Sequence, residues 1–140
     1  MQFQTLFISF LPALAAATNV SYYPGYDEPD RSLAVVACSK ACSDGPNGIF
    51  TKGFTTQASL PHFPLIGGAS TVASWDSANC GNCYSLTYQG RSINVLAVDH
   101  ADMGFNIAKS ALDQLTVGKA AFLGQVEAAW AEVAPRVCGV

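Results

Sequence analysis

The sequence predicts a single, mainly β domain with one α-helix and two disulfides. Short apolar runs alternate with Gly- and Pro-containing turns, most clearly in CYSLTYQGRSINVLAVDH at residues 83–100, a pattern typical of strands. The chain has 140 residues, which leaves no room for a second core. Half of the residues are hydrophobic and 12% are charged, as in a packed domain rather than a disordered chain.

The charge pattern excludes two classes of partner. The net charge is −3 and the Lys and Arg residues are scattered singly. A basic patch for nucleic acid or acidic membrane surfaces is therefore not expected. No segment is long and apolar enough to suggest a membrane span.

The N-terminus resembles an export signal. Residues 3–14 are mostly apolar and lead into Ala15-Ala16-Ala17, a small-residue cleavage site. We therefore expect a signal peptide at residues 1–17 and a mature domain at residues 18–140. The first two residues lack Lys or Arg, and an N-terminal core helix is the alternative. Asn19-Val20-Ser21 would then be a glycosylation sequon at the edge of the mature chain.

The elements of the mature chain follow in order. Residues 20–23 predict a first strand that ends at Pro24-Gly25, and SLAVVAC (32–38) is a second apolar stretch. IFTKGFTT (49–56) predicts a third strand, and PHFPLIGG (61–68) a loop bounded by Pro and Gly. Residues 83–100 predict a hairpin that turns at Gln89-Gly90.

The last third of the chain predicts the helix. Asn106 stands at an N-cap position, ahead of apolar residues at helical spacing, and Gly118 is the predicted stop. AAFLGQVEAAWAEVAP (120–135) is ambiguous. Its Ala and Glu content favours helix, whereas the alternation of Val126, Ala128 and Trp130 also allows a strand.

Five cysteines accompany the export signal: Cys38, Cys42, Cys80, Cys83 and Cys138. Their spacing alone would allow a four-thiolate zinc site, and CGNC alone would allow a redox motif. Both alternatives suit a reducing cytosol better than a secreted chain, where disulfides are the usual state. Two disulfides and one remaining thiol are therefore expected.

Asp99 is the first candidate functional residue. It follows the apolar run Val95-Leu96-Ala97-Val98, where an unpaired carboxylate would be costly to bury. Four roles are open: a catalytic acid, a metal ligand, a hydrogen-bonding post for a ligand that is not cleaved, or a structural acceptor of hydrogen bonds from buried backbone N–H groups. The metal role is the weakest, because a strand points Asp99 and His100 to opposite faces.

Several motifs in register carry a resemblance to a known family. They are VSYYPGYD (20–27), CSDGPNG (42–48), FPLIGGAS (63–70), CGNC (80–83), SINVLAVDH (92–100), DMGFNI (102–107) and VAPRVCGV (133–140). The mature chain resembles, over essentially its whole length, the cerato-platanin family of small secreted fungal proteins. This resemblance implies a six-stranded double-psi β-barrel with one or two short helices, similar to the first domain of expansins and to a family of endoglucanases. It also implies a strand, not a helix, at residues 125–133.

The resemblance implies disulfides Cys42–Cys80 and Cys83–Cys138, with Cys38 left over. Cys42 takes the first position because it carries the Ser-Asp-Gly continuation of the family motif. Cys38 lies close enough in sequence that it is the alternative partner of Cys80. About four extra residues around residues 37–40 depart from the family pattern.

The resemblance further implies a binding protein with no cofactor and no metal. In the related endoglucanases an aspartate at the place of Asp99 is the general acid, but glycoside hydrolysis normally needs a second carboxylate. Asp27 and Asp44 lie in segments that could face the same groove, yet neither stands in a recognisable base motif. We therefore expect little or no hydrolysis.

The implied ligand is chitin or its N-acetylglucosamine oligomers, held in a shallow groove by polar and aromatic side chains. The predicted groove residues are Asp99, Asp44, Asn47, Gln57, Tyr22, His100 and Asn106. Tyr23 stands where many members of the family carry an acidic residue, which sets that edge of the groove apart.

The expected function is that of a secreted, non-catalytic carbohydrate-binding protein at the fungal cell wall. The resemblance adds expansin-like loosening of polysaccharides and elicitation of plant defence, with plant surface receptors as further partners. The alternatives are a weak glycan hydrolase that uses Asp99 as acid, and a surface-active protein that is a monomer or self-assembles weakly. A large exposed apolar patch would favour the last alternative.

Overall fold

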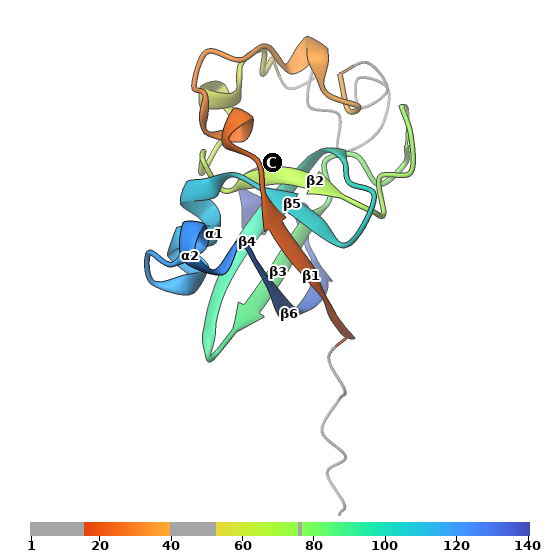
Figure 1. Cartoon of the computed structure of the whole chain (residues 1–140). Coiled ribbons are helices and arrows are strands. Elements are labelled where there is room, and N and C mark those ends of the chain that lie inside the picture. Colours follow the sequence, from red (N-terminus) through yellow and green to blue (C-terminus); the bar gives the residue numbers. More distant parts are fainter. Residues whose placement is uncertain (1–15, 40–52, 76) are drawn as a thin grey trace, which may run out of the picture.

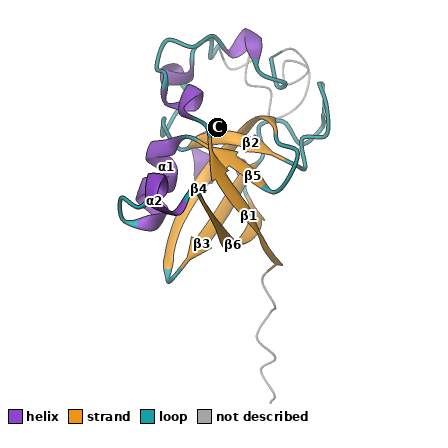
Figure 2. Ribbon diagram, viewed as in Figure 1, coloured by secondary structure: helices purple, strands orange, loops and turns teal. Residues whose placement is uncertain are grey.

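The computed structural model describes residues 16–39, 53–75 and 77–140. In these residues the strands form a closed barrel in the order β1-β5-β2-β4-β3-β6, drawn as the orange arrows of Figure 2. Parallel pairing joins β1 to β5 and β2 to β4, and the other neighbours are antiparallel. The predicted six-stranded barrel with short helices is confirmed. Its strands are β1 (Ala16–Tyr22), β2 (Ile66–Ala69), β3 (Cys83–Tyr88), β4 (Arg91–His100), β5 (Phe105–Ile107) and β6 (Gln125–Val133).

Two strand predictions are confirmed in detail. β3 and β4 form the predicted hairpin, and its turn residues Gln89 and Gly90 both have positive φ, 47° and 79°, as a tight two-residue turn requires. Residues 125–133 form β6, the strand implied by the resemblance. β6 pairs with both β1 and β3, so ladder hydrogen bonds on both sides outweigh the helix propensity of its Ala and Glu residues.

Two other strand predictions need correction. The predicted loop at residues 61–68 contains the start of β2 at Ile66. Its glycines hide the strand pattern, yet a Cβ on Gly67 would lie 2.6 Å from the Ile107 Cα, so close approach of β5 requires glycine there. Of the predicted strand at residues 49–56, the first four residues lie outside the described part. In the remainder, Thr56 makes only an isolated bridge with Ser32.

The helices α1 (Lys109–Thr116) and α2 (Ala120–Leu123) lie beside the barrel, at the left of Figure 1. Asn106 is not the N-cap of α1, because it belongs to β5. Asp27 takes that role from a distant segment: its carboxylate accepts the Lys109 N–H at 2.7 Å and the Ser110 N–H at 3.0 Å. At the other end, Gly118 has a φ of 80° and follows the helix as predicted. None of the described helices is long and apolar enough to cross a membrane.

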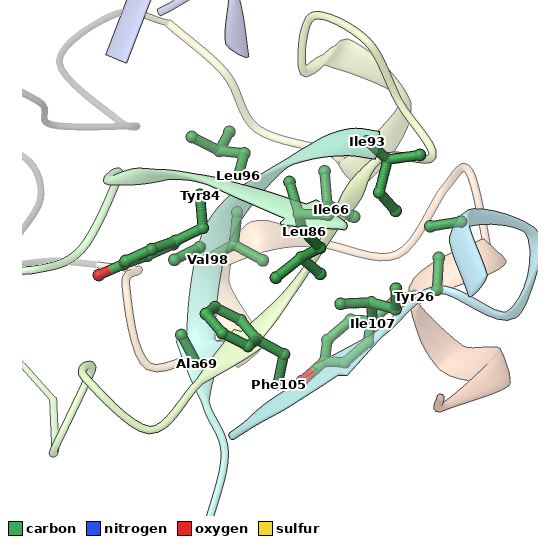
Figure 3. Close-up of a cluster of buried hydrophobic side chains, with 14 of the residues drawn as sticks. Tyr26, Ile66, Ala69, Tyr84, Leu86, Ile93, Leu96, Val98, Phe105 and Ile107 are labelled. Atoms are coloured by element: carbon green, nitrogen blue, oxygen red, sulfur yellow. The ribbon is translucent and has the colours of Figure 1, made fainter. Parts of the chain in front are cut away.

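The core fills the barrel interior. Figure 3 shows Leu86 and Ile66 pointing toward one another among the buried side chains of several strands. Tyr84, Phe105 and Trp130 meet at one side of it in edge-on or tilted contacts, with ring centroids 5.1–5.9 Å apart. These contacts bury apolar surface from β3, β5 and β6 together, which stabilises the closed barrel.

Residues 23–39 and 53–65 form a loop layer, at the top of Figure 1. It contains the short 3-10 helices η1 (Pro24–Asp27), η2 (Leu33–Val35) and η4 (Gln57–Ser59). Gln57 is fully buried there and donates to the carbonyl oxygens of Gly25 at 3.0 Å and Glu28 at 2.7 Å. The layer is therefore held by polar contacts of its own, and the SLAVVAC stretch turns within it instead of crossing the sheet.

One predicted disulfide is confirmed and one is corrected. Cys83 bonds Cys138, with Cα atoms 5.8 Å apart, as expected. Cys80 bonds Cys38 and not Cys42, which lies outside the described residues. The backbone explains the pairing: Cys38 N–H donates to the Val98 carbonyl, while Gly81 N–H, next to Cys80, donates to Ala97. Both cysteines are thus held against the same point of β4, with Cα atoms 5.4 Å apart.

Candidate functional site

Strand pairing brings Ser21, near the start of the chain, into one row with Asp99 and Asn106. Ser21 of β1 pairs with Asn106 of β5, Asn106 with Gly68 of β2, and Gly68 with Asp99 of β4. Directly paired residues share one face of a sheet, so this row lies on the outer wall of the barrel. The Ser21 hydroxyl donates to Asn106 Oδ1 at 3.3 Å, as expected for side chains on one face.

The Asp99 carboxylate is engaged by three donors of the protein itself. Oδ1 accepts the backbone N–H groups of Ala37 and His100, both at 2.9 Å. Oδ2 accepts the Tyr26 hydroxyl, also at 2.9 Å. Asp99 therefore ties the loop layer to β4. Of its four predicted roles, these contacts correspond to the structural acceptor.

Tyr26 secures the other side of this contact. Its side chain is buried, and this burial, reinforced by the adjacent Asp99 carboxylate, raises the pKa of the Tyr26 hydroxyl. The phenol therefore stays protonated throughout the neutral range and remains a donor to Asp99.

An open hollow of about 370 Å³ lies beside the row, between β1, β5 and the segment that follows β4. Its wall combines carboxamide, hydroxyl, imidazole and carboxylate groups with the apolar side chains of an alanine and a methionine, a mixture that suits a hydroxyl-rich ligand. Two predicted groove residues, His100 and Asn106, meet here, whereas Asp99 and Tyr22 do not line it. The lining residues are Asn19, Ser21, His100, Ala101, Asp102, Met103 and Asn106.

His100 is fixed between two acceptors. Its Nδ1 lies 2.6 Å from the Val72 carbonyl oxygen and its Nε2 lies 3.0 Å from Asp102 Oδ1. A neutral imidazole has one N–H, whereas the protonated ring donates to both partners. The Val72 carbonyl, followed by Asp102, therefore raises the pKa of His100. Asp102 is fully exposed, so solvent screens this pair.

Of the other predicted groove residues, Gln57 and Tyr22 do not line the hollow. Gln57 is fully buried, and its amide also accepts from Arg31 at 3.3 Å, which removes it from the surface open to a sugar. Tyr22 is partly buried and packs against the core. Asp44 and Asn47 lie outside the described residues.

Asp27, one of the two possible second carboxylates, already has a structural task. Besides the two N–H groups of α1, its carboxylate accepts the Ser110 hydroxyl. These three donors hold it as a cap of the helix. An inverting hydrolase would instead need a basic carboxylate about 6.5–9.5 Å from the acidic one, with a water bound between them.

Sequence reasoning missed several residues of the hollow. Asn19 and Ser21 could have been found, because they alternate with buried Val20 on the first strand. Asp102 and Met103 lie in a turn, and only the folded chain brings them beside β1. Among the described residues, no group of three or more His, Cys, Asp or Glu side chains is placed to hold a metal.

A second depression, of about 430 Å³, lies at the end of the barrel that carries the helices. Phe122 and Val117 border it and are 88% and 66% exposed. The remaining lining residues are Tyr88, Gln89, Thr116, Lys119 and Leu123. Both depressions mix polar and apolar groups, and the second differs in carrying the two strongly exposed apolar side chains Phe122 and Val117.

Known proteins match the chain along nearly its whole length. The family model for cerato-platanin matches residues 18–140. The heat-stable 19 kDa antigen of Coccidioides immitis is 44% identical over 137 residues, which cover 96% of this chain and 91% of the antigen. The crystal structure of cerato-platanin 2 from M. perniciosa superposes with a TM-score of 0.81 at 41% identity, over 89% of this chain and all of that one.

The solution structure of the fungal elicitor Cerato-Platanin superposes with a TM-score of 0.68 at 33% identity, over 86% of this chain and 95% of that one. Sequence and fold therefore agree along the whole domain, including the closed barrel and the β6 strand. The chain belongs to the cerato-platanin family.

Proposed function

We propose that this protein is a secreted, non-catalytic carbohydrate-binding protein whose ligands are N-acetylglucosamine oligomers, the units of chitin. The observation that carries the proposal is the polar hollow beside the row Ser21, Asn106 and Asp99. Expansin-like loosening of wall polysaccharides would follow from binding without cleavage.

The chemistry of the hollow supports this ligand class. The carboxamides of Asn19 and Asn106 can both donate to and accept from sugar hydroxyl and acetamide groups. Asn19 has no hydrogen-bond partner of its side chain among the described residues, and no buried polar atom there is left unsatisfied. Its amide is therefore open to solvent and available to a ligand. Met103, which is 69% exposed, adds an apolar contact for the carbon face of a pyranose ring.

The contacts of the carboxylates support a role without hydrolysis. Asp99 is held by Ala37, His100 and Tyr26, and Asp27 caps α1. A general acid must deliver a proton to the glycosidic oxygen, and its base must hold a water. Both carboxylates are instead occupied as acceptors of hydrogen bonds from the protein.

The test is a titration of residues 18–140 with chitin oligomers, followed by amide NMR. We expect saturable shifts at Asn19, Ser21, Asn106 and Met103. Asn106→Ala should weaken binding, whereas Asn94→Ala, a matched asparagine of β4 that does not line the hollow, should not. The same samples are analysed for shortened oligomers.

Each outcome of this titration decides between functions. Shifts at the hollow with intact oligomers support the proposal. Shortened oligomers that disappear with Asp99→Asn would make the protein a hydrolase. An absence of shifts with wild type would contradict carbohydrate binding by this site.

The proposal also includes elicitation of plant defence, which is supported by the similarity to one solved structure. The solved structure of one relative is named as that of a fungal elicitor. Treating plant leaves with the folded protein and with the Asn106→Ala variant would test it. A defence response to both proteins would assign elicitation to a surface other than the hollow.

Surface activity is a second candidate function, favoured by two exposed apolar side chains at the second depression. Phe122 is 88% exposed and Val117 is 66% exposed, and both line the depression. If this surface adsorbs at an air–water interface, Phe122→Ser should reduce the lowering of surface tension. An unchanged surface tension would contradict the role of this patch.

A further inference from the structure

The outer face of β1 continues beyond the hollow to an exposed aromatic ring. Asn19 and Ser21 alternate with buried Val20, and Tyr23 has extended backbone angles, φ −134° and ψ 118°. The two-residue alternation of a strand therefore places Tyr23 on the side of Asn19 and Ser21. Tyr23 is 45% exposed, the most open of the aromatic residues next to the polar row.

The Tyr23 ring is held in one orientation. A Cβ on Gly25 would come within 2.2 Å of a ring carbon, so the ring rests against the glycine Cα. Tyr26 meets the ring edge-to-face, with centroids 5.3 Å apart and planes at 87°. The Arg31 guanidinium lies 5.7 Å from the same centroid. Three contacts thus orient a ring that remains nearly half open to solvent.

The same contacts connect the ring to the proposed site. Tyr26, the edge-to-face partner of Tyr23, donates its hydroxyl to Asp99. Asp99 in turn is paired across Gly68 with Asn106, which lines the hollow. A continuous set of contacts therefore joins Tyr23, Tyr26 and Asp99. The polar groups of the hollow lie further along the same face of β1.

An exposed ring of this kind suits the carbon face of a pyranose. Aromatic side chains bind such faces through large, rigid contact areas, and a ring already held in place loses little conformational entropy when a ligand docks. The polar hollow offers hydrogen bonds, and Tyr23 offers the flat apolar contact that the hollow lacks. An acidic residue at this position could not provide that contact.

We propose that Tyr23 is a stacking subsite for one pyranose ring of a β-linked oligosaccharide whose neighbouring rings lie over the hollow. This inference rests on the proposed carbohydrate binding. It makes the length of the ligand part of its recognition, because an oligomer must be long enough to reach both the hollow and the ring. Oligomers too short to do so gain only one of the two contacts.

The test compares four proteins in the NMR titration with N-acetylglucosamine oligomers: wild type, Tyr23→Ala, Tyr23→Phe and Phe122→Ala. We expect Tyr23→Ala to weaken the binding of a hexamer about two- to tenfold. Tyr23→Phe keeps the ring and should bind like wild type. Phe122→Ala removes an even more exposed ring, 88% against 45% for Tyr23, from the second depression and should also bind like wild type. Intermolecular NOEs should join the Tyr23 ring protons to sugar C–H protons.

Three results would overturn the inference. Wild-type affinity in Tyr23→Ala would show that the ring is not in contact with the ligand, while the proposed function would stand. Weak binding by Tyr23→Phe would assign the contact to the hydroxyl and not to the ring. No binding by wild type would remove the proposed function, and the stacking subsite with it. Amide spectra of each variant without ligand establish that the fold is retained.

Discussion

The Asp99 carboxylate connects two parts of the fold. Its oxygens accept hydrogen bonds from Tyr26 and Ala37 of the loop layer and from His100 at the end of β4. Replacing it with Asn puts an NH₂ group where an acceptor is needed. We expect Asp99→Asn to lower the free energy of unfolding by about 1–3 kcal/mol. Chemical denaturation measures this change, with the exposed Asp30→Asn as the control. Equal midpoints for Asp99→Asn and wild type would contradict the role of Asp99 as a structural acceptor.

The protonation of His100 makes the free energy of unfolding depend on pH. Its pKa is raised above the ordinary 6.5 by the Val72 carbonyl first and by Asp102 second. When the pKa of a histidine is higher in the folded than in the unfolded protein, its protonation stabilises the fold. This contribution is complete below the unfolded-state pKa and is lost as the pH rises through the folded-state pKa. Asp102→Asn should therefore lower the pKa of His100 in an NMR titration of its ring protons, while the Val72 contact preserves part of the shift. An unchanged titration would contradict the Asp102 contact.

Helix α1 depends on a residue more than eighty positions away in the sequence. Asp27 accepts the N–H groups of Lys109 and Ser110. Asp27→Ala leaves both donors without that partner, and loss of such a cap costs about 0.5–2 kcal/mol. We expect faster amide hydrogen exchange in the first turn of α1, with Asp30→Ala as the matched control. Unchanged exchange in that turn would mean that other groups satisfy the helix start.

The elements that the sequence predicts well are those with local signals. The β3–β4 hairpin carries strand alternation on both sides of a Gln-Gly turn, and Gly118 marks the end of α1. β2 carries no such signal, because Gly67 and Gly68 lack the side chains that would display alternation. The cap of α1 also has no local signal, because Asp27 arrives from another segment.

For the whole molecule, the Cys38–Cys80 bridge is the feature most open to a direct test. Peptide mapping without reduction should recover Cys38 linked to Cys80. Cys38→Ser should lower the free energy of unfolding by about 2–4 kcal/mol, because it opens a loop of 42 residues. Cys42→Ser should leave the unfolding midpoint unchanged. A Cys42–Cys80 peptide would contradict the pairing seen here.

The candidate site is less visible in the sequence than the fold. Asp99, His100 and Asn106 are close in the chain and were predicted together, yet only the latter two line the hollow. Asn19 and Ser21 join them through the pairing of β1 with β5. Gln57 was predicted to face the groove, but its side chain is buried and holds the loop layer together through hydrogen bonds. Which polar residues face solvent depends on contacts between distant segments, and a single sequence does not display them.

The position of β1 has a consequence for how the protein is made. β1 (Ala16–Tyr22) is bonded on one side to β6 (Gln125–Val133), the last strand to be synthesised. β1 therefore leaves the ribosome long before β6 has been made, and the barrel cannot close until residues 125–133 have emerged. Pairings between such distant segments also slow folding, because a long loop must be ordered before they form. The first strand thus waits, unpaired on that side, until the last one has emerged.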